Sequence, residues 1–239
     1  MINTLDEFIK EFAKIKDMGW IKTHRSGPTG IGKTLEDLLG IPENNLDAPD
    51  FGDYELKSCR INSSSMLTMF TLSPKPPRSN TYLRKKYGYS SKAYDNDEKV
   101  LHSTLTASRF VSIATTGESL KILCDEEKIS ITSTQVVENV YWTKEALKKA
   151  FEKKYKNKFV YVKAENRGSG KDEEFRFVEA YEISGFNYEA MIDLLEEGKI
   201  FVDLRIGQYS DGRTHDHGTG FRIKESDQHL LFKNVSRIG

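Results

Sequence analysis

The first clear pattern along the chain is a helical one close to its start. Apolar side chains recur at intervals of three and four residues, at Leu5, Phe8, Ile9, Phe12 and Ile15. This spacing places them on one face of an α-helix. Thr4 and Glu7 have the spacing of a capping box, in which each side chain accepts a hydrogen bond from the other residue's backbone N–H. The pattern predicts an amphipathic helix from Thr4 to about Met18 that packs on the core.

A shorter helix and two strands follow. Residues Thr34 to Leu39 carry apolar side chains on one side and end at Gly40-Ile41-Pro42, which is a stop signal for a helix. Apolar and polar side chains alternate from Tyr54 to Ser58, which predicts a strand, and Met66 to Leu72 predicts the next one. These two strands are candidates for a hairpin or for neighbouring strands of one sheet.

The rest of the chain mixes further strands and helices. Strand patterns occur at 110–114, 119–124, 129–131, 159–164, 200–206 and 219–223, and helix patterns at 143–155 and 188–197. Ser210-Asp211-Gly212 is a turn signal between the last two strands. Because helices and strands do not alternate as regular βαβ units, the chain is expected to have an α/β fold of the mixed α+β kind.

The composition excludes several classes of protein. The chain has 239 residues, and 36 Lys and Arg balance 36 Asp and Glu. No apolar run approaches the roughly 18 residues of a membrane-spanning helix, and the start lacks the features of a secretory signal. Cys59 and Cys124 are too few for a disulfide scaffold or a thiolate zinc site, although one disulfide stays open. We expect a cytoplasmic protein with no membrane partner.

Charge is segregated along the chain in spite of the zero total. Six basic residues and no acid occur from Pro74 to Lys92, and ten basic residues and three acids from Lys144 to Lys171. Each basic run is either a solvated surface or a source of phosphate contacts. The candidates for such contacts are Arg84, Lys85, Lys86, Lys153 and Lys154.

Two motifs suggest different chemistry, and the first is a phosphate-loop pattern. Gly27-Pro28-Thr29-Gly30-Ile31-Gly32-Lys33-Thr34 matches G-x-x-x-x-G-K-[ST], which predicts nucleotide binding when a buried strand precedes it and a helix follows it. Here the preceding segment is half polar, and the following helix stops after about two turns. A P-loop nucleotide-binding protein that uses Gly27 to Thr34 is therefore kept as the alternative of a different class.

The second motif is Asp50, followed by Glu55-Leu56-Lys57. On a strand, Glu55 and Lys57 share one face while Leu56 faces the core. A turn before the strand would bring Asp50 beside Glu55. Two carboxylates and the Leu56 backbone carbonyl then form an all-oxygen site suited to Mg²⁺, and Lys57 adds a cation that orients water and stabilises developing charge. The competing interpretation is a turn followed by an exposed strand face.

A longer pattern supports the catalytic interpretation. Read together, Gly30 to Gly40, Pro49-Asp50-Phe51 and Tyr54 to Ser58 resemble the G-x-x-L-E-x-x-L-G, P-D-F and E-L-K-[TS] motifs of MutH-like nucleases in the PD-(D/E)XK superfamily. Within that group, the chain resembles the MvaI and BcnI type of restriction endonucleases. This resemblance extends to Arg213 through Ile223 near the end of the chain.

The resemblance implies a restriction-endonuclease-like fold, in which a central mixed β-sheet is flanked by helices and two lobes surround a DNA cleft. We expect a catalytic lobe at about 1–155 and a recognition lobe at about 156–239, or alternatively one continuous domain. The resemblance assigns Asp50 and Glu55 as metal ligands, Lys57 as the catalytic lysine, and Glu36 as the accompanying helix acid.

The activity implied is that of a Mg²⁺-dependent type II restriction endonuclease of a bacterial or archaeal cell. It would cut double-stranded DNA at a short pseudopalindromic site, of CC-N-GG type, and leave 5′-phosphate and 3′-hydroxyl ends. The implied protein is a monomer whose single site cuts one strand and then rebinds for the other, with a companion DNA methyltransferase acting on the same sequence. A MutH-like repair enzyme that nicks one strand and a DNA-binding module with a decayed site are the alternatives.

Candidates for reading the DNA sequence lie in the matching segment near the end. Arginine paired to guanine is the commonest contact of this kind, so the expected DNA-binding residues are Arg213, His215, His217 and Arg222. The pair His215 and His217 is alternatively a transition-metal site or part of an ordinary surface strand.

Overall fold

The computed structural model describes residues 2–42, 49–61, 66–90, 99–154, 158–216 and 218–239. The chain forms two compact units. Unit 1 contains Met1–Ser64, Tyr155–Phe186 and Phe232–Gly239, and unit 2 contains Ser65–Lys154 and Asn187–Leu231. One boundary lies beside the expected division at residue 155, but each unit is assembled from separate segments. The reason is strand pairing, because strands near the start of the chain pair with strands from its second half.

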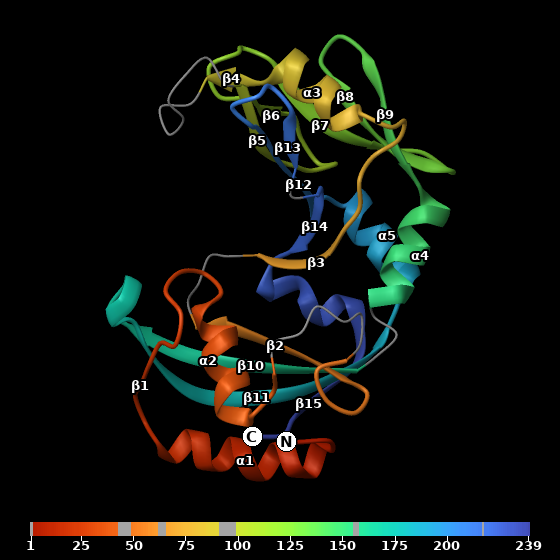
Figure 1. Cartoon of the computed structure of the whole chain (residues 1–239). Coiled ribbons are helices and arrows are strands. Elements are labelled where there is room, and N and C mark those ends of the chain that lie inside the picture. The colour runs from red at the N-terminus through yellow and green to blue at the C-terminus, as the bar shows by residue number, and fades with distance from the viewer. Residues whose placement is uncertain (1, 43–48, 62–65, 91–98, 155–157, 217) are drawn as a thin grey trace. The chain divides into compact units, whose positions relative to one another are not determined.

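Unit 1 is built on a five-stranded sheet in the order β1, β11, β10, β2, with β15 also paired to β11 (Figure 1). The strands are β1 Ile21–Lys22, β2 Tyr54–Arg60, β10 Lys158–Arg167, β11 Glu174–Phe186 and β15 Phe232–Arg237. Strand β2 runs parallel to β10, with Glu55 opposite Phe159 and Lys57 opposite Tyr161, and the other pairs are antiparallel. The mixed sheet expected for this fold is therefore present.

Two helices cover one face of this sheet, α1 Leu5–Asp17 and α2 Gly30–Leu39. Their apolar side chains form a single buried core with alternate residues of the strands, including Leu56 of β2 and Val160 and Val162 of β10. The capping box of Thr4 and Glu7 is present at the start of α1, as predicted. Figure 1 shows α1 running along the sheet below α2.

Helix α2 begins four residues before the predicted Thr34. The chain comes so close at Gly30 that a Cβ there would lie 2.2 Å from the backbone oxygen of Arg25, so only glycine fits. The helix ends as predicted at Gly40, whose left-handed conformation (φ +67°) terminates it. The glycines that resemble a phosphate loop therefore belong to the helix and its tight entry.

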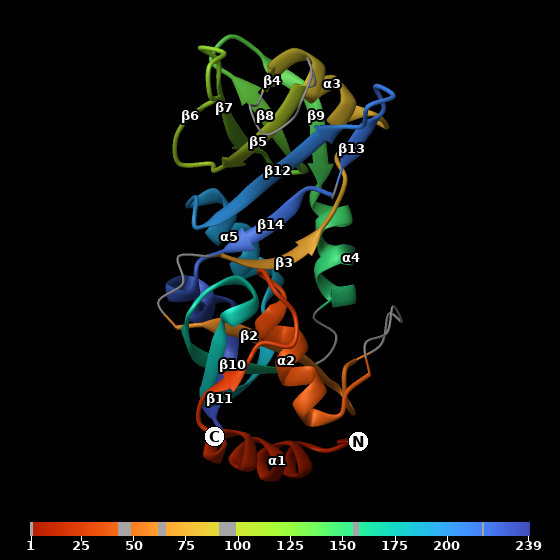
Figure 2. The ribbon, with the colours of Figure 1, turned by 60° about the vertical axis from the view of Figure 1, so that its left-hand side comes forward.

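Unit 2 contains two sheets (Figure 2). The six-stranded sheet has the order β3, β14, β12, β5, β4, with β13 paired to β12, and the four-stranded sheet has the order β6, β7, β8, β9. The first comprises β3 Leu67–Thr71, β4 Tyr89–Ser90, β5 Lys99–Leu105, β12 Ile200–Gln208, β13 Thr214–Asp216 and β14 Gly220–Ile223, and the second comprises β6 Val111–Ser112, β7 Ser119–Cys124, β8 Lys128–Ser133 and β9 Val137–Thr143.

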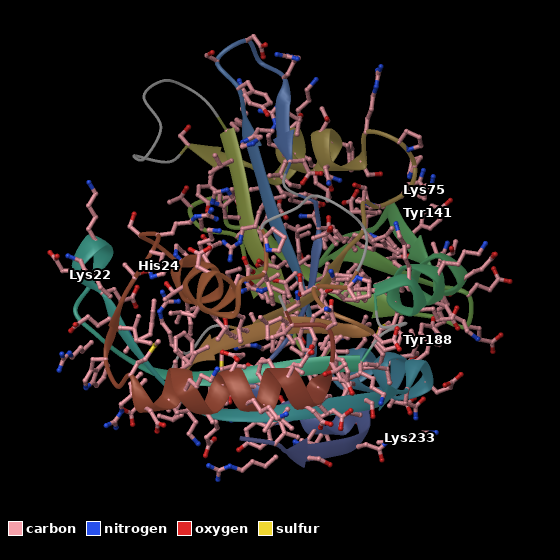
Figure 3. The ribbon with its side chains drawn as sticks, turned by 60° about the horizontal axis from the view of Figure 1, so that its bottom comes forward. Lys22, His24, Lys75, Tyr141, Tyr188 and Lys233 are labelled. Carbon is pink, nitrogen blue, oxygen red and sulfur yellow. The ribbon has the colours of Figure 1, made fainter. Side chains whose placement is uncertain are left out.

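The helices of unit 2 are α3 Ser79–Tyr87, α4 Lys144–Lys154 and α5 Tyr188–Glu196, with short 3₁₀ turns at Gly170–Asp172 in unit 1 and Glu225–Leu231 in unit 2. The segment leading into α3 is fixed to β9, because Lys75 and Tyr141 exchange two backbone hydrogen bonds of 2.7 and 2.9 Å. These two residues lie side by side in Figure 3. No helix in the described part of the chain is long and apolar enough to cross a membrane.

The expected pairing of the strands at 54–58 and 66–72 is wrong, because β2 pairs with β10 in unit 1 while β3 pairs with β14 in unit 2. Strand β11 has no counterpart among the predicted elements. It buries Phe175 and Phe177 on one face, while Arg176 between them pairs across the sheet with Glu165. This alternation was a local strand signal that the sequence reasoning missed.

Candidate active site

A tight turn brings Asp50 back onto strand β2. Phe51 and Tyr54 exchange two backbone hydrogen bonds, of 3.2 and 2.8 Å, and so reverse the chain. The Asp50 carboxylate oxygen Oδ2 then accepts a hydrogen bond of 2.6 Å from the backbone N–H of Leu56. The turn expected before the strand is therefore present, and it fixes the Asp50 carboxylate beside the strand that carries Glu55 and Lys57.

Glu55 and Lys57 lie on the same face of β2, as the alternation of a strand requires. Lys57 Nζ donates a hydrogen bond of 2.6 Å to Glu55 Oε1, and the two side chains are 29% and 14% exposed for Lys57 and Glu55. Leu56 between them is buried in the core of unit 1. Among the strands that the structure describes, β2 has a single partner, β10, so this carboxylate and amine stand at the edge of the sheet.

A pocket of about 420 Å³ lies between the start of α2 and strand β2. Its lining includes Glu36 of α2, Asp50, and Leu56 and Lys57 of β2. Glu55 is not part of the lining and is joined to it through Lys57. Three of the four predicted catalytic residues therefore line one pocket, and the fourth is in contact with that lining.

Glu36 is directed toward β2 across the first turn of α2. A Cβ at Gly32 would lie 3.9 Å from Glu36 Oε1 and 3.7 Å from the Ser58 hydroxyl. The Glu36 carboxylate and the Ser58 side chain thus approach the same glycine from the helix and from the strand. Both distances are ordinary van der Waals contacts for a Cβ, so a methyl group would also fit at this point of the pocket wall.

The donors of the expected metal site suit a hard divalent cation. The carboxylates of Asp50 and Glu55 and the backbone carbonyl of Leu56 supply oxygen only, which is the preference of Mg²⁺. No group of three or more His, Cys, Asp or Glu side chains that could hold a metal ion occurs within the described residues. Such a site would therefore depend on the backbone carbonyl and on water to complete its coordination.

The phosphate-loop residues adopt a different geometry. Lys33 lies inside α2 and forms an ion pair of 2.7 Å with Asp37, four residues on. The buried Thr34 hydroxyl donates to the Gly30 backbone oxygen (2.8 Å) and accepts from the His24 N–H (3.0 Å). Strand β1 has only two residues, Ile21 and Lys22. Figure 3 labels Lys22 and, close to it, His24. The two-residue β1 is not a buried strand, and the Thr34 hydroxyl, which would contact a metal in a phosphate loop, is used in these two hydrogen bonds.

Asp37 links α2 to the segment that precedes it. Its second oxygen, Oδ2, lies 2.9 Å from His24 Nδ1. A hydrogen bond from Lys33, which has the larger effect, and one from His24 hold the pKa of Asp37 below its ordinary value. The cation of Lys33 therefore serves an ion pair within the helix, in addition to lining the pocket.

Two of the expected DNA-reading residues lie on one hairpin of unit 2. Arg213 precedes β13, is 78% exposed and pairs with Asp211 at 2.7 Å. His215 is in β13, and its ring packs on Tyr209 with centroids 4.6 Å apart. His217 lies outside the described residues. Arg213 and His215 thus occupy an exposed turn and the strand that follows it.

Arg222 is held differently. It lies in β14, where its guanidinium contacts Asp203 Oδ2 at 2.9 Å and the backbone oxygen of Met66 at 3.0 Å. Asp203 is almost fully buried and also accepts from Thr104 and Arg205. Arg222 therefore neutralises a buried carboxylate, and its side chain is only 20% exposed.

The basic run before β4 is only partly a free surface. Arg84 is 4% exposed and contacts Gln208 and the backbone oxygen of Gly212, so its burial argues against it as a candidate for phosphate contacts. Lys85 and Lys86 are both exposed, but Lys86 is bonded to the buried Glu138 at 2.8 Å. Sequence reasoning treated all three as equivalent surface cations because the burial of α3 is a tertiary feature.

Two residues that sequence reasoning did not select also belong to the site. Arg25 lines the pocket, and Arg60 at the end of β2 contacts the loop beside it. Arg25 lies in a polar loop, where no pattern distinguishes it. Arg60 lies two residues beyond the predicted Ser58, on the face of β2 that carries Leu56, where a charged residue breaks the alternation and so gave no signal.

Comparison with known proteins gives a consistent result. The sequence model of the MvaI/BcnI restriction endonuclease family matches residues 9–232. A solved complex described as restriction endonuclease MvaI with cognate DNA substrate is 34% identical over 100% of both chains, with a TM-score of 0.84. A structure of restriction endonuclease MvaI in the absence of DNA is 32% identical over 100% of this chain and 99% of that one, with a TM-score of 0.62. No curated protein sequence matches.

Proposed function

Because the chain belongs to the MvaI/BcnI restriction endonuclease family and is therefore a type II site-specific deoxyribonuclease, we propose that Asp50, Glu55 and Lys57 carry its chemistry. The observation that supports this most directly is the hydrogen bond from the Leu56 N–H to Asp50. It joins the first carboxylate to the strand on which Glu55 and Lys57 are already paired. Glu36 would assist from α2, as the helix acid of the same pocket.

The family implies dependence on a divalent metal ion, and we propose that this ion is Mg²⁺. Asp50, Glu55 and the Leu56 carbonyl would hold it, since all three offer hard oxygen donors. When bound, such an ion supplies positive charge that activates water and stabilises the phosphoryl transition state. The protein contributes a rigid frame, because the turn at Phe51–Tyr54 and strand β2, whose Leu56 is buried in the core, fix the donors.

Lys57 has a separate role in the proposed reaction. Its ammonium group is held on Glu55 Oε1, so the amine is kept near the pocket rather than extended into solvent. From there it orients the attacking water and stabilises charge that develops on the phosphate oxygens. Hydrolysis then breaks the bond between phosphorus and the 3′ oxygen, leaving a 5′-phosphate and a 3′-hydroxyl.

The substrate proposed is double-stranded DNA with a short pseudopalindromic site of CC-N-GG type. The solved relative is described as a complex with its cognate DNA substrate. In this chain, Arg213 and His215 of the hairpin, together with His217, are the proposed base-reading residues. Arg222 would contact a base only if its guanidinium gave up its hydrogen bond to Asp203. We further propose a monomer that acts beside a methyltransferase of the same specificity.

The decisive experiment is plasmid cleavage in nucleotide-free buffer. With Mg²⁺ we expect discrete fragments, and with EDTA we expect none. Asp50→Asn keeps an oxygen that can accept from Leu56 but removes the charge, so we expect a loss of at least about 100-fold in rate. The matched control is Asp53→Ala, which removes an exposed acid of the same turn and should cleave like the unmodified protein.

Sequencing the fragment ends tests the proposed target at the same time. Ends that share a CC-N-GG motif would support it, and ends at an unrelated sequence would remove it. Undiminished cleavage by Asp50→Asn, or cleavage that persists in EDTA, would contradict the proposed catalytic residues. Nicks confined to one strand would favour the MutH-like alternative.

A further inference from the structure

Arg60, the last residue of β2, makes an unusually complete set of contacts within unit 1. Its Nε and Nη2 atoms donate to the two carboxylate oxygens of Glu173, at 2.7 and 2.8 Å. Its Nη1 donates to the backbone oxygen of Pro28 at 3.1 Å, and Nη2 also donates to that of Gly27 at 3.2 Å. A single side chain thus joins strand β2, the segment before β11 and the loop before α2.

The carboxylate partner is itself held firmly. Glu173 is 7% exposed, and its Oε1 accepts a second hydrogen bond from Asn166 at 3.1 Å. The Glu173 backbone oxygen accepts from Thr23 N at 2.8 Å. Hydrogen bonds from Arg60 hold the pKa of Glu173 below its ordinary value in spite of burial. A bidentate pair of this kind fixes the plane of the guanidinium group, which also lies over the Phe175 ring at 5.1 Å.

Of the two carbonyls that Arg60 contacts, one belongs to Pro28 in the lining of the catalytic pocket, and the other to Gly27, the residue before it. Arg25, Pro28 and Thr29 line that pocket opposite strand β2. The Gly27 carbonyl additionally accepts from the N–H of Gly30, the first residue of α2. The position of Arg60 therefore sets the position of the loop and of the helix start that follows it. Helix α2 carries Glu36 into the same pocket.

We propose that Arg60 is a positioning residue for DNA cleavage, which holds the loop at 25–29 at a fixed distance from the strand that bears Glu55 and Lys57. This rests on the proposed function of Asp50, Glu55 and Lys57. The buried core already joins α2 to β2 through Leu35 and Leu56, so the fold does not depend on Arg60 alone. Arg60 additionally fixes the position of the loop at 25–29 beside the pocket. A shift of about 1 Å in such a position can cost about 100-fold in rate.

The test is a single-turnover cleavage rate at saturating DNA and Mg²⁺, together with DNA affinity measured without catalysis. For Arg60→Met we expect a rate loss of about 10- to 100-fold, with DNA affinity within about 3-fold, since the loop is displaced but the DNA-reading hairpin lies in unit 2. Added methylguanidinium should restore part of the rate to Arg60→Ala, because it can occupy the same carboxylate and carbonyl acceptors.

Arg167→Met is the matched control. Arg167 is the last residue of the adjacent strand β10, pairs with Glu174 through Nε at 2.6 Å and lies over the Trp20 ring at 4.4 Å. It thus has the same kinds of contact as Arg60, namely one glutamate and one aromatic ring, while neither Glu174 nor Trp20 lines the pocket. We expect its cleavage rate to stay within about 2-fold of the unmodified protein.

Two results would overturn the proposal. The first is an unchanged cleavage rate in Arg60→Met with a lowered unfolding temperature, which would make the role of Arg60 structural. The second is an equal loss of rate in Arg167→Met. If Arg60→Met does not fold, Glu173→Gln decides instead, since it weakens the hold on the guanidinium while retaining its shape, and an unchanged rate there counts against the proposal. Failure of the proposed function is distinguishable, because Asp50→Asn would then cleave at the rate of the unmodified protein, whatever the rate of Arg60→Met.

Discussion

At the scale of single residues, this chain uses buried carboxylates to hold its cations in place. Glu173 holds Arg60, Asp203 holds Arg222, and Glu138 holds Lys86. Each of these carboxylate side chains is less than 10% exposed. A buried ion pair is costly to break because the remaining charge stays desolvated. Two of these cations, Lys86 and Arg222, were candidates for DNA contacts, and both form ion pairs with buried carboxylates within the fold.

Glu138 leads to a prediction about acid stability. Burial acts to raise the pKa of Glu138, but hydrogen bonds from Lys86, Tyr82 and Tyr87 outweigh it, and the pKa lies below its ordinary value. Because the pKa is lowered in the folded state, ionised Glu138 stabilises the fold above about pH 4.3, the ordinary glutamate pKa. This stabilisation is lost as the pH falls through the lower pKa of Glu138 in the folded protein. Unfolding by denaturant should therefore become easier below about pH 4.

Glu138→Gln isolates this contribution. The substitution keeps the shape but removes the charge, so we expect a loss of about 1 to 3 kcal/mol in the free energy of unfolding at pH 7. The difference between the two proteins should shrink as the pH falls, because the glutamate becomes neutral as well. Glu145→Gln is the control, since Glu145 forms an exposed pair with Lys149 that is expected to contribute little. A constant difference at all pH values would contradict the assignment.

At the scale of elements, helix α3 supports the hairpin that carries the proposed DNA-reading residues. Thr81 of α3 shares a hydrogen bond of 2.8 Å with Thr214, and Asn80 donates to Asp216. Arg84 contacts Gln208 and Gly212 from the same helix. The other side of α3 is joined to β9 through Glu138. The helix thus links the second sheet of unit 2 to the hairpin.

We expect the Arg84 contacts to affect sequence discrimination. Arg84→Met removes the guanidinium that holds both sides of the hairpin, so the hairpin should be positioned less firmly against base edges. The ratio of cleavage rates on the cognate site and on sites with one changed base pair should fall by about 10-fold, which is within the 1 to 3 kcal/mol that one base contact supplies. Competition cleavage of the two substrates measures this ratio directly.

Lys85→Met is the matched control for Arg84, because Lys85 is the adjacent, exposed cation of the same helix. Its loss removes at most a phosphate contact, which weakens binding to all sequences about equally. An unchanged ratio in Arg84→Met would show that α3 does not support base reading. A changed ratio in Lys85→Met would mean that charge, and not the geometry of the hairpin, is responsible.

At the scale of the whole molecule, the chain brings one set of catalytic residues to a substrate with two strands. Unit 1 holds Asp50, Glu55 and Lys57, and unit 2 holds Arg213 and His215. If the protein acts as a monomer, each binding event cuts one strand. Nicked circular plasmid should therefore accumulate before linear DNA appears, and the rate per enzyme should not depend on enzyme concentration.

Gel analysis of a cleavage time course, repeated over a range of enzyme concentrations, checks this expectation. Linear DNA that forms without a nicked intermediate, at a rate that rises with the square of the enzyme concentration, would indicate a dimer. Light scattering in the presence of a short cognate duplex provides an independent measure of the assembly.

The sequence by itself determined the features that depend on neighbouring residues. The spacing of Leu5, Phe8 and Phe12 with the Thr4 cap specified the first helix, and the stop at Gly40 specified the end of the second. The separation of Asp50 from Glu55-Leu56-Lys57, combined with the surrounding family motif, identified the endonuclease. These features are local because a cap, a turn and a strand face are each decided within a few residues.

Only the tertiary structure decided what distant residues do for one another. Local pattern did not separate Arg84, which is buried under the hairpin, from Lys85, which is exposed, and it did not connect Arg60 to Glu173 across more than a hundred residues. It also suggested that β2 and β3 are partners, although they belong to different units. Strand pairing and ion-pair partners depend on which segments the buried core brings together, and no short stretch of sequence contains that information.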